Sequence, residues 1–282
     1  MKAIQYFLIC LLLFAGGACT QPATVQNPPG YDLSKPEVYK MPAVLEEISG
    51  IAFKNGNADT IYAEQDEDGK LFYMHWGDAE LSALKFARKG DYEDIAICNE
   101  WIVILKSDGT LFNFSFSQFN EKEPGNEQAG LLPAGEYESL YADAATNTLY
   151  VLCKDCPGSK KEKLVNGFML KLGAGGQLTA AGNFSIDEKE IETLNGGKKI
   201  NLKASAFAKN AQTGEWYILS SVNKILLVTD AAWKVKNVYP LAPGLFPQPE
   251  GIAFDNSHNL YISNEGGGVG AGSILKFVYQ NK

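Results

Sequence analysis

Three glutamates stand at equivalent places in this chain, each directly before a small residue and a short apolar run. They are Glu93, Glu138 and Glu250, and Ser49 and Lys203 take the same place before two further runs. Carboxylates gathered at one point repel one another unless a cation or protons compensate their charge. Ca²⁺ takes about six to eight oxygen ligands, so Glu93, Glu138 and Glu250 are candidate metal ligands if the fold brings them together.

The runs that follow these residues form a long internal repeat. They cover residues 49–53, 93–97, 138–142, 203–207 and 250–254, and their first residues are 44, 45, 65 and 47 positions apart. A repeat of about 40 to 50 residues made of short β-branched and aromatic segments is typical of a propeller of four-stranded blades. The sequence therefore predicts an all-β chain, a β-propeller of five four-stranded blades.

Two further observations bear on the number of blades and the closure of the ring. The fifth repeat ends before it has supplied a fourth strand, so residues 37–41 are predicted to complete the last blade. In the second blade the fourth strand is expected at residues 131–132. A sixth blade in the 65-residue step is the alternative, but residues 187–199 there resemble a charged excursion more than a set of strands.

The first strand of each propeller blade lines the central channel, so the five repeat starts should meet at one mouth. Glu64, Asp66 and Glu265 follow second strands and should reach the same face. Three arrangements could compensate these acidic groups, and they remain open at this stage. They are a bound Ca²⁺, a structural network with Lys203 and neighbouring lysines, or a small polar ligand carrying both signs of charge.

The N-terminal segment predicts export. Residues 1–18 combine a basic start, an apolar stretch and a small-residue processing site, which is typical of a lipoprotein signal peptide. Cys19 is the expected lipidation site, residues 19–33 a flexible tether and residues 34–282 the propeller domain. We therefore expect an exported protein that is lipid-anchored to a membrane of the cell envelope, on the periplasmic or outer-membrane side. The net charge of −8 argues against nucleic acid as a partner.

Cysteine spacing adds one structural expectation. Cys153 and Cys156 are three residues apart in a chain predicted to be exported, where a small disulfide loop can form. Neither has further cysteine or histidine neighbours of the kind a zinc site requires. The pair is therefore expected to be structural.

Several repeat starts carry a family resemblance. Residues 49–53, 92–96 and 138–141, and above all residues 247–255 followed by 259–265, resemble the SdiA-regulated family of exported bacterial β-propellers. The resemblance spans residues 44–277. It implies a propeller on the outer side of the inner membrane, with associated calcium and no settled reaction. Lys203 departs from the acidic or small residue expected at a repeat start.

The function expected from these observations is binding. No nucleophile and base stand at a spacing that indicates an enzyme, so we expect an envelope propeller that binds calcium, a small polar ligand or an envelope protein at its channel mouth. The alternative is a metal-dependent hydrolase of phosphoesters or lactones that uses the same channel.

Overall fold

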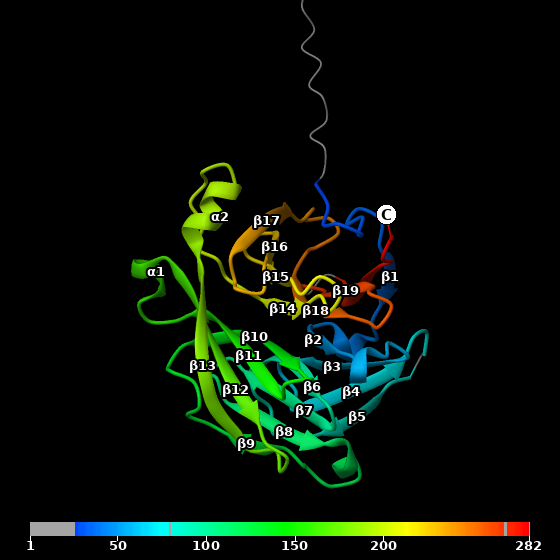
Figure 1. Ribbon diagram of the computed structural model, residues 1–282. Helices are drawn as coiled ribbons and strands as arrows, with labels where there is room; N and C mark the ends of the chain where they lie inside the picture. The colour runs from blue at the N-terminus through cyan, green and yellow to red at the C-terminus, as the bar shows by residue number, and fades with distance from the viewer. Residues whose placement is uncertain (1–25, 79, 268–269, 282) are drawn as a thin grey trace, which may run out of the picture.

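Five antiparallel sheets of four strands each make up the fold (Figure 1). The computed structural model describes residues 26–78, 80–267 and 270–281. The innermost strand of every sheet contacts the innermost strand of the next, and the fifth contacts the first, which closes a ring around a central axis. The five-bladed β-propeller predicted from the repeat is thereby confirmed.

The strands of each blade follow one another in sequence from the axis outward, except in the last blade. The first three blades consist of β2 (Ile48–Ala52), β3 (Thr60–Gln65), β4 (Lys70–His75) and β5 (Ser82–Lys85); β6 (Tyr92–Cys98), β7 (Trp101–Lys106), β8 (Leu111–Ser115) and β9 (Asn126–Gln128); and β10 (Glu136–Asp143), β11 (Thr148–Asp155), β12 (Leu164–Leu172) and β13 (Leu178–Asp187). The fourth blade consists of β14 (Ala206–Lys209), β15 (Trp216–Ser220), β16 (Ile225–Thr229) and β17 (Val235–Pro240).

The last blade joins the two ends of the domain. It contains β18 (Pro249–Phe254), β19 (Leu260–Asn264) and β20 (Ser273–Phe277), and its outer strand is β1 (Glu37–Lys40). Strands β1 and β20 are antiparallel, with Glu37 opposite Lys276. The ammonium of Lys276 lies 3.2 Å from the Glu37 carboxylate. The predicted closure by an N-terminal strand is confirmed, and it removes an open edge from β20.

Packing between blades explains why the inner strands are apolar. Five separate clusters of buried side chains lie at the five blade interfaces. Between the last and first blades, for example, Ile51 and Phe53 pack with Ala253 and Tyr261. Each sheet therefore has two buried faces, and each interface contributes its own share of apolar burial to stability.

Two segments differ from the expected strand pattern or add to it. The fourth strand of the second blade is β9, so the prediction of residues 131–132 is wrong. Leu131 and Leu132 instead pack half-buried against the core between the second and third blades, which uses their apolar character without strand pairing. The charged excursion after the third blade contains α2 (Glu188–Leu194), capped by the Asp187 carboxylate, which accepts a hydrogen bond from the Lys189 amide.

Short helical turns complete the described part. They are η1 (Ala43–Leu45), η2 (Lys54–Gly56), η3 (Phe116–Gln118) and α1 (Ser159–Glu162). Among the residues that the structure describes, no helix has the length and apolar character needed to span a bilayer.

The N-terminal boundary of the packed domain lies earlier than residue 34. Tyr31 and Leu33 are buried against the fourth and fifth blades, and the Tyr31 hydroxyl donates a 2.7 Å hydrogen bond to the carbonyl of His258. The end of the expected tether is therefore part of the propeller. The predicted signal peptide (1–18), Cys19 and residues 20–25 lie outside the described residues.

Candidate functional site

Alternate side chains of each inner strand point to the two neighbouring blades: in β2, Ala52 packs with Ile95 of the second blade and Ile51 packs with Ala253 of the last blade. Glu93 and Glu250 belong to blades that are not neighbours, yet their carboxylates raise each other's electrostatic energy. Both carboxylates must therefore be directed toward the shared axis. Together with Ser49 and Glu138 they occupy the same end of the channel, the acidic mouth.

The fourth blade contributes a different residue from the one expected. Ala206 pairs with Leu219 in that blade as Gly251 pairs with Ser263 in the last blade. By this register Ser205 stands where Glu250 stands, and Lys203 lies two residues too early. The repeat in the sequence placed Lys203 at this position, because a shift of the apolar run by two residues leaves its composition almost unchanged. At the mouth the fourth blade offers hydroxyl groups: Ser221 and Ser205 lower the pKa of Glu250 against the stronger effect of burial, and the Ser205 hydroxyl donates a 2.7 Å hydrogen bond to the Pro249 carbonyl.

Glu64 is the most deeply buried acidic side chain of the mouth. It is fully inaccessible to solvent, and its Oε1 accepts a 2.7 Å hydrogen bond from the Gly50 amide. Its Oε2 has no hydrogen-bond partner, and the same holds for Oδ1 of Asp66 and of the buried Asn264. Burial, followed by the nearby charges of Asp94, Glu93 and Asp66, holds the pKa of Glu64 well above its ordinary value.

The other carboxyl groups of the mouth also retain protons more strongly than usual. Burial, then the charge of Asp91, raises the pKa of Glu93 to about 8. Burial, then the charge of Glu250, raises the pKa of Glu265 to about 7. For Asp66, burial and then the charge of Glu47 raise the pKa to about 6. These groups are held close enough together that protons compensate part of their charge near neutral pH.

Lys154, from the end of β11, is a cation that acts on several of these carboxyl groups, and Lys224 also lowers the pKa of Glu250. Its ammonium forms an ion pair with Glu138 and lies 3.1 Å from the carboxylate of Glu136. Its positive charge also lowers the pKa values of Glu93, Glu250 and Glu265, against the stronger effect of burial. Sequence reasoning grouped Lys154 with other lysines and did not single it out, because its pairing depends on the blade geometry.

A disulfide restricts the conformation of the loop that carries Lys154. Cys153 and Cys156 are bonded to each other, with their Cα atoms 5.9 Å apart. Lys203 holds the same loop from the fourth blade, because its ammonium donates hydrogen bonds to the Lys154 carbonyl at 3.2 Å and to Asp155 at 2.6 Å. Lys203 therefore supports the rim of the acidic mouth without lining it.

The predicted calcium ligands are not arranged as a ready-made triad. Within residues 26–78, 80–267 and 270–281, no group of three or more acidic, histidine or cysteine side chains has a geometry that could hold a metal ion. Glu138 is engaged by Lys154, whereas the unpartnered oxygens of Glu64, Asp66 and Asn264 belong to the first and last blades. Those oxygens are donors of the kind that hard cations take, although they too belong to no ready-made group of three acidic side chains.

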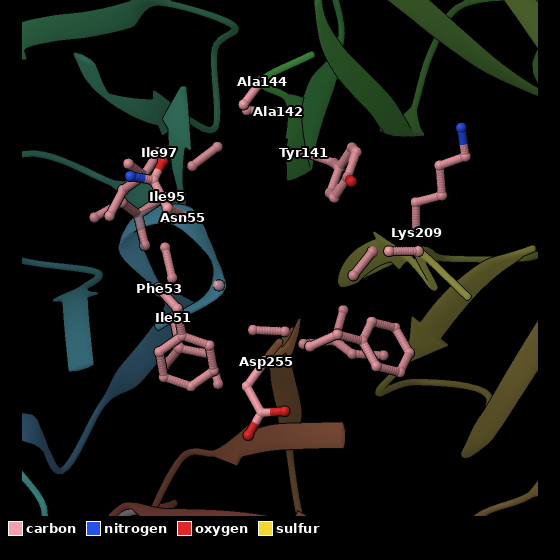
Figure 2. Close-up of a pocket in the computed structure, with 18 of the residues that line it drawn as sticks. Ile51, Phe53, Asn55, Ile95, Ile97, Tyr141, Ala142, Ala144, Lys209 and Asp255 are labelled. Atoms are coloured by element: carbon pink, nitrogen blue, oxygen red, sulfur yellow. The ribbon is translucent and has the colours of Figure 1, made fainter. Parts of the chain in front are cut away.

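The opposite end of the channel holds a cavity of about 260 Å³, lined by apolar side chains and by the polar side chains of Asn55, Lys209, Asp255 and Asn256. Its walls include Phe53, Ile97 and Ala142 from three different blades (Figure 2). Lys209 stands at its edge and directs its ammonium away from the middle, while Asp255 is held by hydrogen bonds from Asn259 and Tyr261. Five buried apolar side chains, one from each inner strand, also line this cavity: Ile51, Ile95, Leu140, Phe207 and Ile252.

Comparison with known proteins agrees with this geometry. The fold and its acidic mouth define a five-bladed β-propeller with a charged channel entrance. The model of the SdiA-regulated family matches residues 165–267, and over that stretch the predicted resemblance is confirmed.

Solved structures share the fold at low sequence identity. Glutaminyl cyclase from Myxococcus xanthus is 15% identical, with a TM-score of 0.58 over 87% of this chain and 96% of that chain. Regucalcin from Agrobacterium tumefaciens, a calcium-binding protein, is 13% identical, with a TM-score of 0.50 over 89% of this chain and 97% of that chain. None of the curated proteins compared matches the sequence.

Proposed function

We propose that this chain is an envelope lipoprotein, anchored through lipid at Cys19, whose propeller binds a divalent cation at the acidic mouth, with calcium as the candidate ion. The observation that carries the proposal is Glu64, a fully buried carboxyl group with one oxygen left unpartnered beside Glu93 and Asp66. A buried acceptor without a partner is costly, and a cation would relieve both that cost and the mutual repulsion.

The raised pKa values support the same proposal. Protons already compensate part of the charge on Glu93 and Glu265, and a divalent cation could replace them. The residues that would hold it are Glu64, Asp66, Glu93, Glu250 and Glu265, with the Asn264 amide oxygen beside them. The calcium-binding description of the regucalcin structure gives weak additional support, since that similarity concerns the fold.

The test is calcium-dependent stability. Thermal unfolding of the full chain, purified in mild detergent, is followed with calcium and with a chelator. A cation present at about 100 times its dissociation constant stabilises the folded state by about 2.7 kcal/mol, which corresponds to a rise of roughly 5 to 10 °C in melting temperature. We expect Glu64→Gln to reduce this rise strongly. No difference between calcium and chelator in the unmodified chain would remove the proposal.

Glu188→Gln is the matched control. Glu188 is also buried, and its Oε1 accepts a 2.8 Å hydrogen bond from the Leu202 amide, as Glu64 accepts one from Gly50. It lies in α2, and the charges that act on it are those of Glu192, Lys163 and Lys203, with no carboxyl group of the mouth among them. We expect its variant to keep the full calcium effect, so that loss in Glu64→Gln reports the site and not the removal of a buried carboxylate in general.

The second candidate is the metal-dependent hydrolase. Glu64 favours it to this extent: burial holds the pKa of this carboxyl group well above its ordinary value, as a general acid requires. Assaying the same preparations against phosphomonoesters and lactones with calcium present tests it. Turnover that Glu64→Gln abolishes and Glu188→Gln retains would support an enzyme, and absence of turnover would leave binding as the function.

A further inference from the structure

Lys154 places a positive charge that acts on three of the carboxyl groups proposed to hold the cation. Its side chain is about three-quarters buried, at 23% exposure, and its ammonium lies between the carboxylates of Glu136 and Glu138. Its charge also acts on Glu93, Glu250 and Glu265, which lie on two other blades. A single ammonium group therefore interacts with carboxylates from three of the five blades.

Two interactions restrain the backbone of Lys154. The disulfide between Cys153 and Cys156 encloses Lys154 in a loop of four residues, and Lys203 binds the backbone carbonyl of Lys154 itself. A lysine with a free backbone loses conformational entropy when it pairs at a surface, and such pairs contribute little. Here the loop has already restricted the backbone, so less entropy is lost when Lys154 pairs with Glu138.

We propose that Lys154 is an internal counter-ion that competes with the bound cation. Binding of the cation displaces the Lys154 ammonium from Glu138, and this displacement lowers the affinity most for ions of low charge. The inference rests on the proposed cation site. Coulomb energy scales with the charge of the ion, so a divalent cation displaces the ammonium more effectively than a monovalent one. Lys154 is thus a specificity-determining residue of the mouth, and the disulfide loop sets its position.

The first experiment compares calcium affinity between lysine variants of the full chain by isothermal titration calorimetry. We expect Lys154→Met to bind calcium about tenfold more tightly, because the competing charge is gone while the apolar stem remains. Lys154→Arg keeps the charge and should bind calcium much as the unmodified chain does. Lys106→Met is the control: Lys106 ends the second strand of the neighbouring blade, and its ammonium lies 3.2 Å from Asp108 of its own turn.

The second measurement follows the displacement in the unmodified chain. The amine of Lys154 is acetylated with a water-soluble reagent, and the modified peptides are quantified by mass spectrometry. We expect calcium to speed acetylation of Lys154 and to leave Lys106 unchanged. A purely structural Lys154 would keep the same rate with calcium and without it.

The outcomes test the counter-ion role of Lys154 separately from the proposed cation site. If the unmodified chain binds calcium and Lys154→Met binds it equally or less tightly, the counter-ion role is wrong and the proposed function stands. If neither chain binds calcium, both are wrong. Binding by Lys154→Met alone would support the counter-ion role and show that Lys154 blocks the site in the unmodified chain.

Discussion

The two ends of one channel differ in almost every chemical respect although the same five strands build them. At the acidic mouth, carboxyl groups with raised pKa values lie beside unpartnered oxygens and one lysine. At the other end, Phe53, Ile97 and Ala142 supply apolar walls to a cavity, and the Asp255 carboxylate that also lines it accepts hydrogen bonds from Asn259 and Tyr261. Residues that pack the blades and residues that could bind a ligand therefore occupy different positions of the same short repeat.

The largest expected effect concerns packing at the cavity end. Phe53 is 7% exposed and packs edge-on against Tyr261, with ring centroids 4.8 Å apart. Phe53→Ala should cost about 3 kcal/mol of unfolding free energy, because it removes buried apolar area between two blades. Urea denaturation measures this loss. We expect the calcium-induced rise in melting temperature to be unaffected, and its disappearance in this variant would show that the two ends are coupled.

A smaller effect is expected at the loop that carries Lys154. Replacing both Cys153 and Cys156 by serine should lower the unfolding free energy by about 2 kcal/mol, the value for closing a loop of four residues. The variant should also bind calcium more tightly, since Lys154 would no longer be held on Glu138. Adding a reductant should lower the stability of the unmodified chain toward that of the variant. Equal stability of the two chains under oxidising conditions would contradict the prediction.

A change of pH sharpens the same contrast without any substitution. Glu93, with a pKa of about 8, and Glu265, with a pKa of about 7, hold protons in the folded chain that the unfolded chain releases near pH 4.5. The folded state therefore binds more protons than the unfolded state between those values, and its stability must fall as pH rises. We expect the melting temperature to fall steadily from pH 5 to pH 8 in the presence of chelator.

Calcium and a variant at the mouth provide the controls for this pH dependence. Calcium should flatten the decline, because it replaces protons that leave the carboxylates, and its own affinity should increase with pH. Glu93→Gln should also reduce the slope, whereas Phe53→Ala should lower the whole curve without changing the slope. A melting temperature that rises steadily from pH 5 to pH 8 would contradict the assignment of protonated carboxyl groups at the mouth.

The repeat was sufficient to predict the blades because the burial of each inner strand requires apolar residues at regular intervals along the chain. Each inner strand must be apolar to pack against two neighbours, so the period, the blade number and the closure by β1 could all be read from the chain. The error at residues 131–132 arose because Leu131 and Leu132 are apolar for interface packing, whereas β9 is polar and short. Outer strands are partly solvated, and their sequence signal is correspondingly weak.

The site was predictable only in outline for a related reason. The places of Glu93, Glu250 and Glu64 follow from strand order. In the fourth blade, by contrast, the register of the strands decides that Ser205 and not Lys203 lies at the mouth. The pairing of Lys154 with Glu138 joins the end of β11 to the start of β10 within one blade. A two-residue shift leaves the composition of an apolar run unchanged while it moves a charge out of the channel.

The sequence by itself determined the architecture, since hydrophobic periodicity and repeat length leave few ways to bury so many short strands. It also determined that acidic groups from distant segments share one end of an axis. Only the tertiary structure decided which oxygens of that group stay unpartnered, which protons are retained and which lysine compensates the charge. These properties depend on distances of a few ångströms between blades, and electrostatic energy in a partly buried site changes steeply over such distances.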